Sequence, residues 1–360
     1  MQPKKPKLIY VIGPNFCVKS LAYESLLLLS KTYEVICISE GPKIEDINFK
    51  HSPIIFNREP SPFKDLLSLI QLSKLIFHNR DAKKIVISTP KISLLAAIAC
   101  LLNFKSYIYL HRGAVYQNFI GTKFIIYKLI DKFIISFSSN TSYISLSLFK
   151  WIKSNLKIKK INYNRNFNSS KGVDLQKFFV KKDSSLNDLK IIGYCGRVAS
   201  DKGYDELINL VNEYSSNANV LIKIKGKVEL NRSDSELFFN LIKKKEIIFE
   251  KWDENVVNFY QNIDLLFFPT KREGFGNVAI EAAACGVPTV AFNIPGVSDA
   301  IKHDVSGILV DQDDDICKNV KKLINNDQKL MDLSFSSRLF IENNFDQDIV
   351  LKDLHRSMGL

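Results

Sequence analysis

Short runs of β-branched and aromatic residues alternate with longer helical patterns along the whole chain. This alternation is typical of βαβ units and parallel sheets. In the first half it predicts helices at Phe63–His78, Ser93–Asn103 and Asn140–Lys153. The strands predicted around them are Leu8–Ile12, Tyr33–Ser39, Pro53–Phe56, Lys84–Ser88, Ser106–Leu110 and Phe133–Ser138.

The alternation stops around Arg165–Asp188, where a polar, turn-rich stretch predicts a linker. It then resumes, and helical stretches at Lys321–Asn343 and Gln347–His355 close the chain. The strands predicted in this half are Lys190–Tyr194, Asn219–Ile224, Ile247–Trp252, Leu265–Pro269, Thr289–Phe292 and Gly307–Val310.

The pattern therefore predicts an α/β protein with two doubly wound, Rossmann-like domains facing a cleft. We expect residues 1–170 to form the first domain and residues 186–335 the second, with C-terminal helices in 336–360 returning toward the first. In such sheets ligands bind beyond the carboxyl ends of the strands. A length of 360 residues suits two domains, and 46% hydrophobic with 24% charged residues is ordinary for a globular protein.

The apolar segments and the cysteines indicate where the protein resides. The longest apolar segment, Ile92–Leu102, is shorter than the roughly 20 residues that span a bilayer, and the N-terminal apolar run is too short for a signal peptide. Six scattered cysteines without a C-x-x-C pair favour a reducing compartment and speak against a zinc site. We expect a cytoplasmic protein, soluble or peripheral at the inner face of the membrane.

A net charge of +12 favours anionic partners: phosphorylated small molecules, an acidic membrane surface or nucleic acid. Nucleic acid rests on charge alone, because no recognisable binding module is present. Lys150, Trp151 and Lys153, with further lysines nearby, mix cationic and aromatic groups. They form either a face for an anionic bilayer and a lipid-linked acceptor, or an ordinary amphipathic helix with solvated lysines.

The nucleotide-binding motifs of common folds are absent from the sequence. The first strand ends in Gly13-Pro14 without the G-x-G-x-x-G of dinucleotide folds, and no Walker A motif occurs. The second half instead has Gly196-Arg197 and Lys202-Gly203 between a strand and a helix. Two cations before a helix N-terminus suit a diphosphate, although a surface loop with solvated charges is the simpler alternative.

A second motif, KREGFGNVAIEAAACG, follows the strand Leu265–Pro269. Glycines 274 and 276 allow close approach of the backbone to a ligand. Glu281 lies about one helical turn beyond Asn277, on an otherwise apolar helix. A carboxylate there lies on a solvated face or, if buried, needs a partner, which the vicinal hydroxyls of a ribose would supply. Glu273 suits the hydroxyls of a sugar in the same way.

Together these residues resemble glycosyltransferase family 4, the retaining, nucleotide-sugar-dependent transferases of the GT-B fold. The resemblance rests on Gly-Arg-x4-Lys-Gly at 196–203, Glu-x7-Glu at 273–281, AIEAAACGVPTVA with Pro295-Gly296, and Gly172-Val173-Asp174, where Lys171 replaces the usual Asn. Gly13-Pro14 departs from the paired glycines of many members. The segments STPKISLLAAIAC and YLHRGAVY are similar to those of bacterial enzymes that extend lipid-diphosphate-linked sugars for the O-antigen of lipopolysaccharide, for capsule or for glycoprotein glycans.

The resemblance implies a role for each matching residue. Arg197 and Lys202 would bind the donor diphosphate and stabilise its growing charge, Glu281 would hold the ribose, and Glu273 the transferred sugar. His111 would lie near the donor sugar, and the remaining donor contacts would come from Gly196, Gly274, Phe275, Gly276 and Asn277. Transfer would proceed from the front face with retention, and the leaving phosphate would take the acceptor proton.

No metal and no cofactor are expected, since Arg197 and Lys202 neutralise the diphosphate. The Asp-x-Asp within Asp311–Asp315 follows a late strand and is interpreted as a solvated turn. UDP is the commoner donor nucleotide in such enzymes, with GDP the alternative. The competing functions are a nucleotide-sugar epimerase or phosphorylase of the same architecture, or a degenerate transferase that acts as a membrane-associated binding protein.

Overall fold

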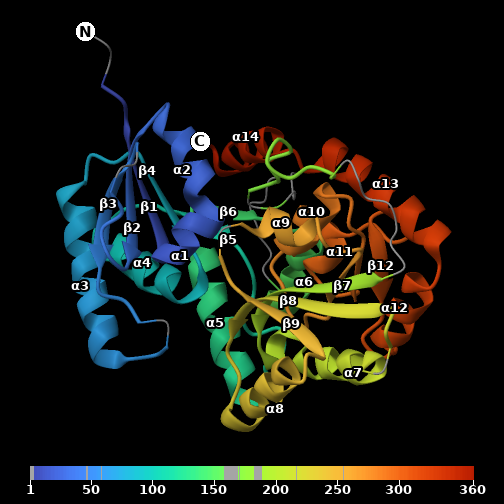
Figure 1. Cartoon of the computed structure of the whole chain (residues 1–360). Helices are drawn as coiled ribbons and strands as arrows, with labels where there is room; N and C mark the ends of the chain where they lie inside the picture. Colours follow the sequence, from blue (N-terminus) through green and yellow to red (C-terminus); the bar gives the residue numbers. More distant parts are fainter. Residues whose placement is uncertain are drawn as a thin grey trace. The chain divides into compact units, whose positions relative to one another are not determined.

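A computed structural model gives the fold of the chain (Figure 1). It describes residues 4–45, 48–57, 59–157, 169, 171–181, 189–215, 217–253 and 255–360, so half of the predicted linker Arg165–Asp188 lies outside the described residues. The chain divides into two compact units. One comprises Met1–Lys171 with Val350–Leu360, and the other comprises Gly172–Ile349.

Within its described residues, the first unit contains a six-stranded parallel sheet in the order β3-β2-β1-β4-β5-β6. The strands are β1 (Lys7–Pro14), β2 (Glu34–Glu40), β3 (Lys50–Ile54), β4 (Lys84–Ser88), β5 (Ile108–His111) and β6 (Asn140–Tyr143). The helices are α1 (Asn15–Cys17), the π-helical turn η1 (Val18–Ala22), α2 (Tyr23–Ser30), α3 (Pro62–His78), α4 (Pro90–Leu102), α5 (Gly121–Phe137) and α6 (Leu146–Leu156).

Three local predictions in the first unit were wrong. The strand predicted at Pro53–Phe56 begins earlier, as β3 (Lys50–Ile54), because it is Lys50 to Ile54 that pair with β2. The run Phe133–Ser138, predicted as a strand, forms the last turns of α5, because Tyr127, Asp131 and Ile134 continue one inward-facing helical stripe. The edge strand is β6 instead, whose sequence NTSY lies where the start of a helix was predicted. Its small hydroxyl side chains carry no hydrophobic alternation, so only pairing with β5 identifies it as a strand.

The described part of the second unit repeats this topology, with a six-stranded parallel sheet in the order β12-β11-β10-β7-β8-β9. Its strands are β7 (Lys190–Val198), β8 (Val220–Val228), β9 (Ile247–Lys251), β10 (Leu265–Phe268), β11 (Thr289–Phe292) and β12 (Gly307–Val310). Its helices are the 3₁₀ turn η2 (Ser200–Lys202), α7 (Tyr204–Tyr214), α8 (Arg232–Lys243), α9 (Val256–Tyr260), α10 (Asn277–Ala284), α11 (Val297–Ala300), α12 (Ile316–Ile324) and α13 (Asp327–Asn344).

Both sheets have the strand order of Rossmann-like folds, which confirms the predicted fold class. The central strands are buried on both faces, as β1 and β10 illustrate, which explains their nearly continuous apolar sequences. No helix within the described ranges is both long and apolar enough to cross a bilayer.

The last helix, α14 (Gln347–Met358), returns the chain to the first unit from Val350 onward. Its His355 bonds Ser25 of α2, with Nε2 2.8 Å from the hydroxyl oxygen. Just before α14, Val173 forms a bridge with Asp346, and its amide donates to Phe345 O at 2.8 Å. Gly172 has φ +62°, and a Cβ there would lie 2.8 Å from Gln347 Cα, which explains the glycine of the Gly172-Val173-Asp174 motif.

Candidate active site

The first site motif begins inside a strand. The strand β7 was predicted to end at Tyr194, but Gly196 and Arg197 continue its pairing with β8, and Val198 is its last residue. The loop proper is the 3₁₀ turn η2, followed by Gly203 at φ +81° and then α7. Arg197 is therefore held by a sheet, while Lys202 lies in the turn at the carboxyl end of that sheet.

Gly203 brings this turn against the end of β10. A Cβ on Gly203 would lie 2.2 Å from Pro269 O, so the close contact requires glycine. The amide of Lys271 donates to Asp201 O at 3.1 Å and ties the two loops together. Because β7 and β10 are adjacent parallel strands, both motifs lie at the same edge of the sheet.

Lys202 and Glu273 pair directly across these loops. The Nζ of Lys202 lies 2.5 Å from Glu273 Oε1 and 3.1 Å from Arg272 O. The other carboxylate oxygen of Glu273 accepts from the amide of Gly274 at 3.1 Å. Both side chains are partly buried, at 17% and 24% exposure, so the pair is only partly screened by solvent.

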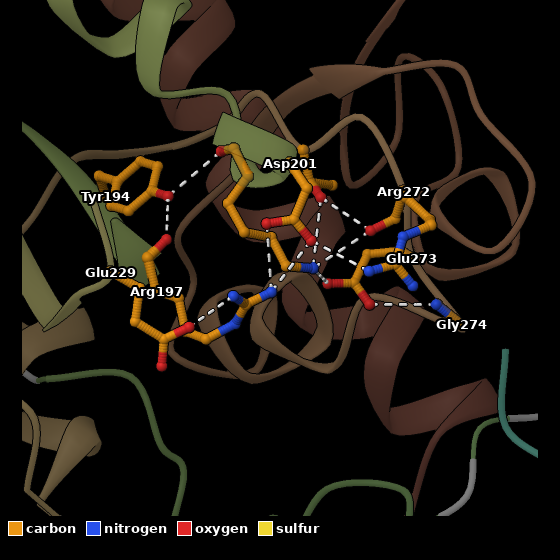
Figure 2. Close-up of polar contacts among 9 residues, drawn as sticks. Tyr194, Arg197, Asp201, Glu229, Arg272, Glu273 and Gly274 are labelled. Carbon is orange, nitrogen blue, oxygen red and sulfur yellow. Dashed lines mark hydrogen bonds and ion pairs between the residues drawn. The ribbon is translucent and has the colours of Figure 1, made fainter. Parts of the chain in front are cut away.

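Arg197 lies between two carboxylates, as Figure 2 shows. Its Nη1 is 2.8 Å from Glu229 Oε2, and its Nη2 is 3.0 Å from Asp201 Oδ2. Arg272 Nη2 also donates to Asp201 Oδ2, at 3.0 Å. Burial by itself would raise the pKa of Asp201, but Arg197, Lys202 and Arg272 outweigh it and hold that pKa below its ordinary value. Asp201 is thus ionised and fixes both guanidinium groups.

Sequence reasoning missed five residues of this cluster: Tyr194, Asp201, Glu229, Thr270 and Arg272. The Tyr194 hydroxyl donates to Arg197 O at 2.6 Å and so fixes the backbone at the end of β7. Asp201 and Arg272 lie inside or beside the two motifs, so charge alternation within the motifs was an available signal. Glu229 had no such signal, because only the pairing of β8 with β7 brings it to Arg197.

Glu281 lies on the buried side of α10, not on a solvated face. It is 6% exposed, and the Tyr260 hydroxyl donates to its Oε2 at 3.2 Å. Tyr260 stays protonated, because burial raises its pKa well above the usual value. Asn277, which starts α10, is half-buried one turn earlier. A buried carboxylate with this donor satisfies the need for a partner that the apolar helix created.

The glycine loop before α10 has a specific backbone shape. Gly276 has φ +92° and is the N-cap of α10, whereas the Phe275 side chain is buried and packs edge-on against Phe345 at 5.5 Å. Gly296 approaches the loop so closely that a Cβ there would lie 2.7 Å from Glu273 O. The loop thus offers backbone groups near Glu273, while the phenyl ring belongs to the core.

His111, at the end of β5 in the first unit, is fully buried. Its Nε2 lies 3.0 Å from Asp131 Oδ2, and the Tyr116 hydroxyl donates to the same oxygen at 2.8 Å. Its Nδ1 has no hydrogen-bond partner among the described residues. At the carboxyl end of β1, the amide of Gly13 donates to Thr89 Oγ1 at 2.9 Å, so that amide is already bonded.

The first unit also contains a cavity of about 530 Å³ at the carboxyl ends of its strands. Most of its wall is apolar or aromatic, including Phe56, Leu94, Phe119 and Ile130. Its polar lining includes Tyr109, Tyr116, Asp131 and the ion pair of Lys91 with Asp65. This volume lies within the range of roughly 300–1,000 Å³ for small-molecule sites.

Lys150 and Lys153 are exposed on α6, but Trp151 is half-buried and packs against Tyr116, with 5.5 Å between ring centroids. Of their predicted neighbours, Lys159 and Lys160 lie outside the described residues. On α6 itself, Leu148 and Ile152 are fully buried. This helix therefore has the ordinary amphipathic arrangement, with solvated lysines and an inward apolar side.

The acidic run Asp311–Asp315 forms an exposed turn after β12, as interpreted from the sequence. Asp315 is the N-cap of α12, and its Oδ1 accepts from the amides of Cys317 and Lys318. Across the parts of the chain that the structure describes, no group of three or more His, Cys, Asp or Glu residues is placed to hold a metal ion.

Comparison with known proteins identifies the family. Residues 176–339 match the family described as glycosyl transferases group 1. Over 98% of its length the chain is 30% identical to CapM of Staphylococcus aureus, a capsular polysaccharide biosynthesis glycosyltransferase, of which 96% is covered. The chain belongs to this family. It is a glycosyltransferase, as its two motifs implied.

Solved structures confirm the GT-B fold of this glycosyltransferase. Sucrose-phosphate synthase from Thermosynechococcus elongatus superposes with a TM-score of 0.78 at 14% identity, over 98% of both chains. HepE of Anabaena, solved with UDP and glucose, has a TM-score of 0.79 at 15% identity, over 98% of this chain and 99% of its own. At these identities the likeness concerns the fold alone.

Proposed function

We propose that this glycosyltransferase moves a sugar with retention from a UDP-sugar to a glycan acceptor linked to a lipid diphosphate, in surface polysaccharide biosynthesis. The observation that carries the proposal is the pairing of Lys202 with Glu273 beside Arg197, at the adjacent ends of β7 and β10. The capsular role of CapM and the UDP bound to HepE support the pathway and the nucleotide.

In this mechanism the cations act on the leaving group. Arg197 and Lys202 lie where a diphosphate at the strand ends would gain negative charge, and fixed cations in a partly buried site stabilise that charge. Arg272 adds a third cation, since it shares Asp201 with Arg197. The carboxylates of Asp201 and Glu229 hold the guanidinium groups in place, so little reorganisation accompanies transfer.

Hydroxyl recognition falls to the two glutamates. Glu281, with Tyr260 donating to Oε2, would accept from the ribose hydroxyls, and Glu273 would accept from the transferred sugar. The backbone of Gly274, Phe275 and Gly276 would line the same sugar. The bond from C1 to the donor phosphate breaks, the acceptor oxygen bonds C1 from the same face, and its proton passes to the leaving phosphate.

The acceptor side is assigned to the first unit. The cavity there is mainly apolar, which suits an acceptor that carries a lipid, and its few polar groups suit a sugar or phosphate near its entrance. His111 Nε2 bonds Asp131, whereas His111 Nδ1 would bond a hydroxyl of a sugar. We place the enzyme peripherally at the inner face of the cytoplasmic membrane, where such acceptors are made.

Calorimetric titration with UDP, GDP, ADP and CMP, each with and without EDTA, tests the donor assignment. We expect micromolar, EDTA-insensitive binding of UDP, and a loss of roughly ten-fold or more in Glu281→Gln, because a hydrogen bond to a charged group is worth about 1.5–3 kcal/mol. Glu236→Gln, an exposed carboxylate on α8 of the same unit, is the control. Silence across the nucleotides from a folded protein would contradict the proposal.

The stereochemistry has its own test. With a UDP-sugar and a synthetic lipid-diphosphate acceptor, NMR of the first-formed product should show the anomeric configuration of the donor. Arg197→Gln and Lys202→Gln should each lower kcat about 10²-fold or more while the product keeps that configuration. An inverted product would rule out front-face transfer even if UDP binds as expected.

A further inference from the structure

Three helices of the first unit form one layer on one face of its sheet. The connections β3 to β4, β4 to β5 and β5 to β6 all run in the same direction across the sheet, so right-handed crossovers place α3, α4 and α5 on the same face. The helix α4 packs against both α3 and α5. The connection from β1 to β2 runs the other way and places α2 on the opposite face.

The outer side of this layer is apolar where a soluble protein usually has polar residues. On α3 the exposed stripe includes Phe63 at 74% and Leu66 at 55%, and on α5 it includes Ile126 at 56% and Leu129 at 58%. We call this surface the α3–α5 face. It comprises Phe63, Leu66, Ile70 and Phe77 of α3, the half-buried Ile98 and Leu101 with the exposed Leu102 of α4, and Ile125, Ile126 and Leu129 of α5.

The charged side chains that these helices expose to solvent are mainly lysines. Residues 62–137 contain eleven lysines and arginines, of which Lys64, Lys74, Lys123 and Lys132 are exposed on the helices. The acidic residues of the same stretch are each engaged in a pair: Asp65 with Lys91 at 2.6 Å, Asp81 with Lys7 at 3.0 Å, and Asp131 with His111 at 3.0 Å. The face thus combines exposed apolar side chains with uncompensated positive charge.

We propose that the α3–α5 face rests on an anionic bilayer. Large apolar side chains enter the headgroup boundary while lysines bind anionic headgroups, which is the chemistry of an interfacial surface. A second copy of the chain is a poorer occupant, because a symmetric pairing would oppose two lysine-rich surfaces. This inference rests on the proposed function, and it moves the membrane contact from α6, where Trp151 packs inward, to α3 and α5.

One consequence concerns the acceptor. The inward side of α5 supplies Tyr127, Ile130 and Ile134 to the wall of the cavity, while its outward side carries Ile125, Ile126 and Leu129. A single helix thus separates the proposed bilayer contact from the proposed acceptor cavity. The lipid part of an acceptor would have to pass only around α5 to reach the cavity.

Vesicle flotation of the full chain tests the proposal. We expect binding to vesicles of equal parts phosphatidylglycerol and phosphatidylethanolamine, weak binding to phosphatidylcholine, and release at high salt. The triple variant Leu66→Ser, Ile126→Ser and Leu129→Ser should bind vesicles more weakly by roughly ten-fold or more, since each change removes apolar area that would be buried in the bilayer. The control is Leu237→Ser with Phe239→Ser on α8, which are exposed to a similar degree beside acidic residues.

A labelled cysteine distinguishes insertion from protein contact. The six native cysteines are buried, and burial raises the pKa of Cys37, Cys100, Cys195, Cys285 and Cys317 to about 12, so Leu129→Cys can be labelled selectively. A polarity-sensitive dye at 129 should shift to the blue with anionic vesicles, and the same dye at Leu237→Cys should not. A blue shift that depends on protein concentration without vesicles would mean self-association and overturn the proposal.

The outcomes separate this inference from the proposed function. UDP titration of the Leu66→Ser, Ile126→Ser and Leu129→Ser variant without vesicles should match the unaltered protein, because all three positions lie outside the donor loops. If UDP binds but anionic vesicles do not, the membrane face is wrong and the donor assignment stands. If vesicles bind but no nucleotide does, the proposed function fails and the face remains.

Discussion

In each unit a buried polar side chain bonds a partner that lies far away in the sequence. Glu281 receives Tyr260 in the second unit, and His355 bonds Ser25 in the first. Neither pair could be predicted from the sequence, because the partners lie 21 and 330 positions apart in the chain. In each case removing one member deprives a buried polar group of a hydrogen bond.

Tyr260→Phe should lower the free energy of unfolding of the second unit by about 1–3 kcal/mol, because Glu281 loses a buried donor. Urea unfolding followed by circular dichroism measures the change. Tyr214→Phe is the matched control, since the buried Tyr214 hydroxyl has no hydrogen-bond partner among the described residues. Equal effects of the two substitutions would show that the bond to Glu281 contributes nothing.

His355 should make the first unit sensitive to acid. Burial lowers its pKa from 6.5 to about 4, so the folded state favours the neutral ring. The neutral ring's contribution to the free energy of unfolding is fully present above about pH 6.5. It is lost as the pH falls toward 4, by up to about 3 kcal/mol. Melting temperatures across this window should fall less in His355→Gln than in the unaltered protein. An equal fall of the melting temperature in both proteins would contradict this role for His355.

Loops at the ends of β7 and β10 assemble the site, and their shape depends on glycines with positive φ. Gly203 packs on Pro269, and Gly276 starts α10. These contacts join two motifs that lie 70 positions apart, as the bond from Lys202 Nζ to Arg272 O illustrates. The helices that follow the loops are ordinary, so the function of this edge resides in the loop conformations.

Gly203→Ala should weaken UDP binding at least ten-fold and cost about 1–3 kcal/mol of stability, because the new methyl group would overlap Pro269 O and displace Lys202. Calorimetry and urea unfolding measure the two effects. The control is Gly121→Ala, because Gly121 also has a positive φ (+60°) but has open space around it. This substitution therefore measures the backbone strain without the steric clash. An unchanged UDP affinity in Gly203→Ala would mean that the two loops are not coupled.

Two units with the same strand order divide the tasks of the whole chain. The loops proposed to bind the donor lie in Gly172–Ile349, whereas the cavity and the α3–α5 face lie in the first unit. The C-terminal helix α14 nevertheless belongs to the first unit. Its Ser357 accepts from Asn140 of β6 at 2.8 Å and bonds Ser142, while Leu351 and Leu354 are buried.

Truncation after Ile349 should therefore destabilise the first unit and spare donor binding. We expect calorimetric melting to show an earlier transition for the first unit, while UDP still raises the transition of the second. Removal of Gly359 and Leu360 alone is the control. Loss of UDP binding in a truncated protein whose second unit remains folded would show that α14 acts on the donor site.

Much of the fold was predictable, and its errors have physical causes. Strands such as Lys84–Ser88 and Thr289–Phe292 were predicted with correct limits, because buried parallel strands have continuous apolar sequences. The apolar end of α5 was predicted as a strand and the polar strand β6 as the start of a helix. A short apolar run fits a strand or a buried helix equally well. The structure brings the motif residues Arg197, Lys202 and Glu273 into one cluster, and it adds Glu229 and Arg272, which were not predicted.

The amino-acid sequence by itself determined the α/β class, the division into two similar halves and the positions of the two glycosyltransferase motifs, because each is encoded in local periodicity or in short spacings. Only the tertiary structure decided which side chains meet. The bond of Arg197 to Glu229 depends on β8 lying beside β7, and the pair of Lys202 with Glu273 depends on β10 lying on the other side of β7. The bond of Glu281 to Tyr260 depends on α9 reaching α10. Strand order and loop shape result from packing of the whole chain, so no local pattern contains them.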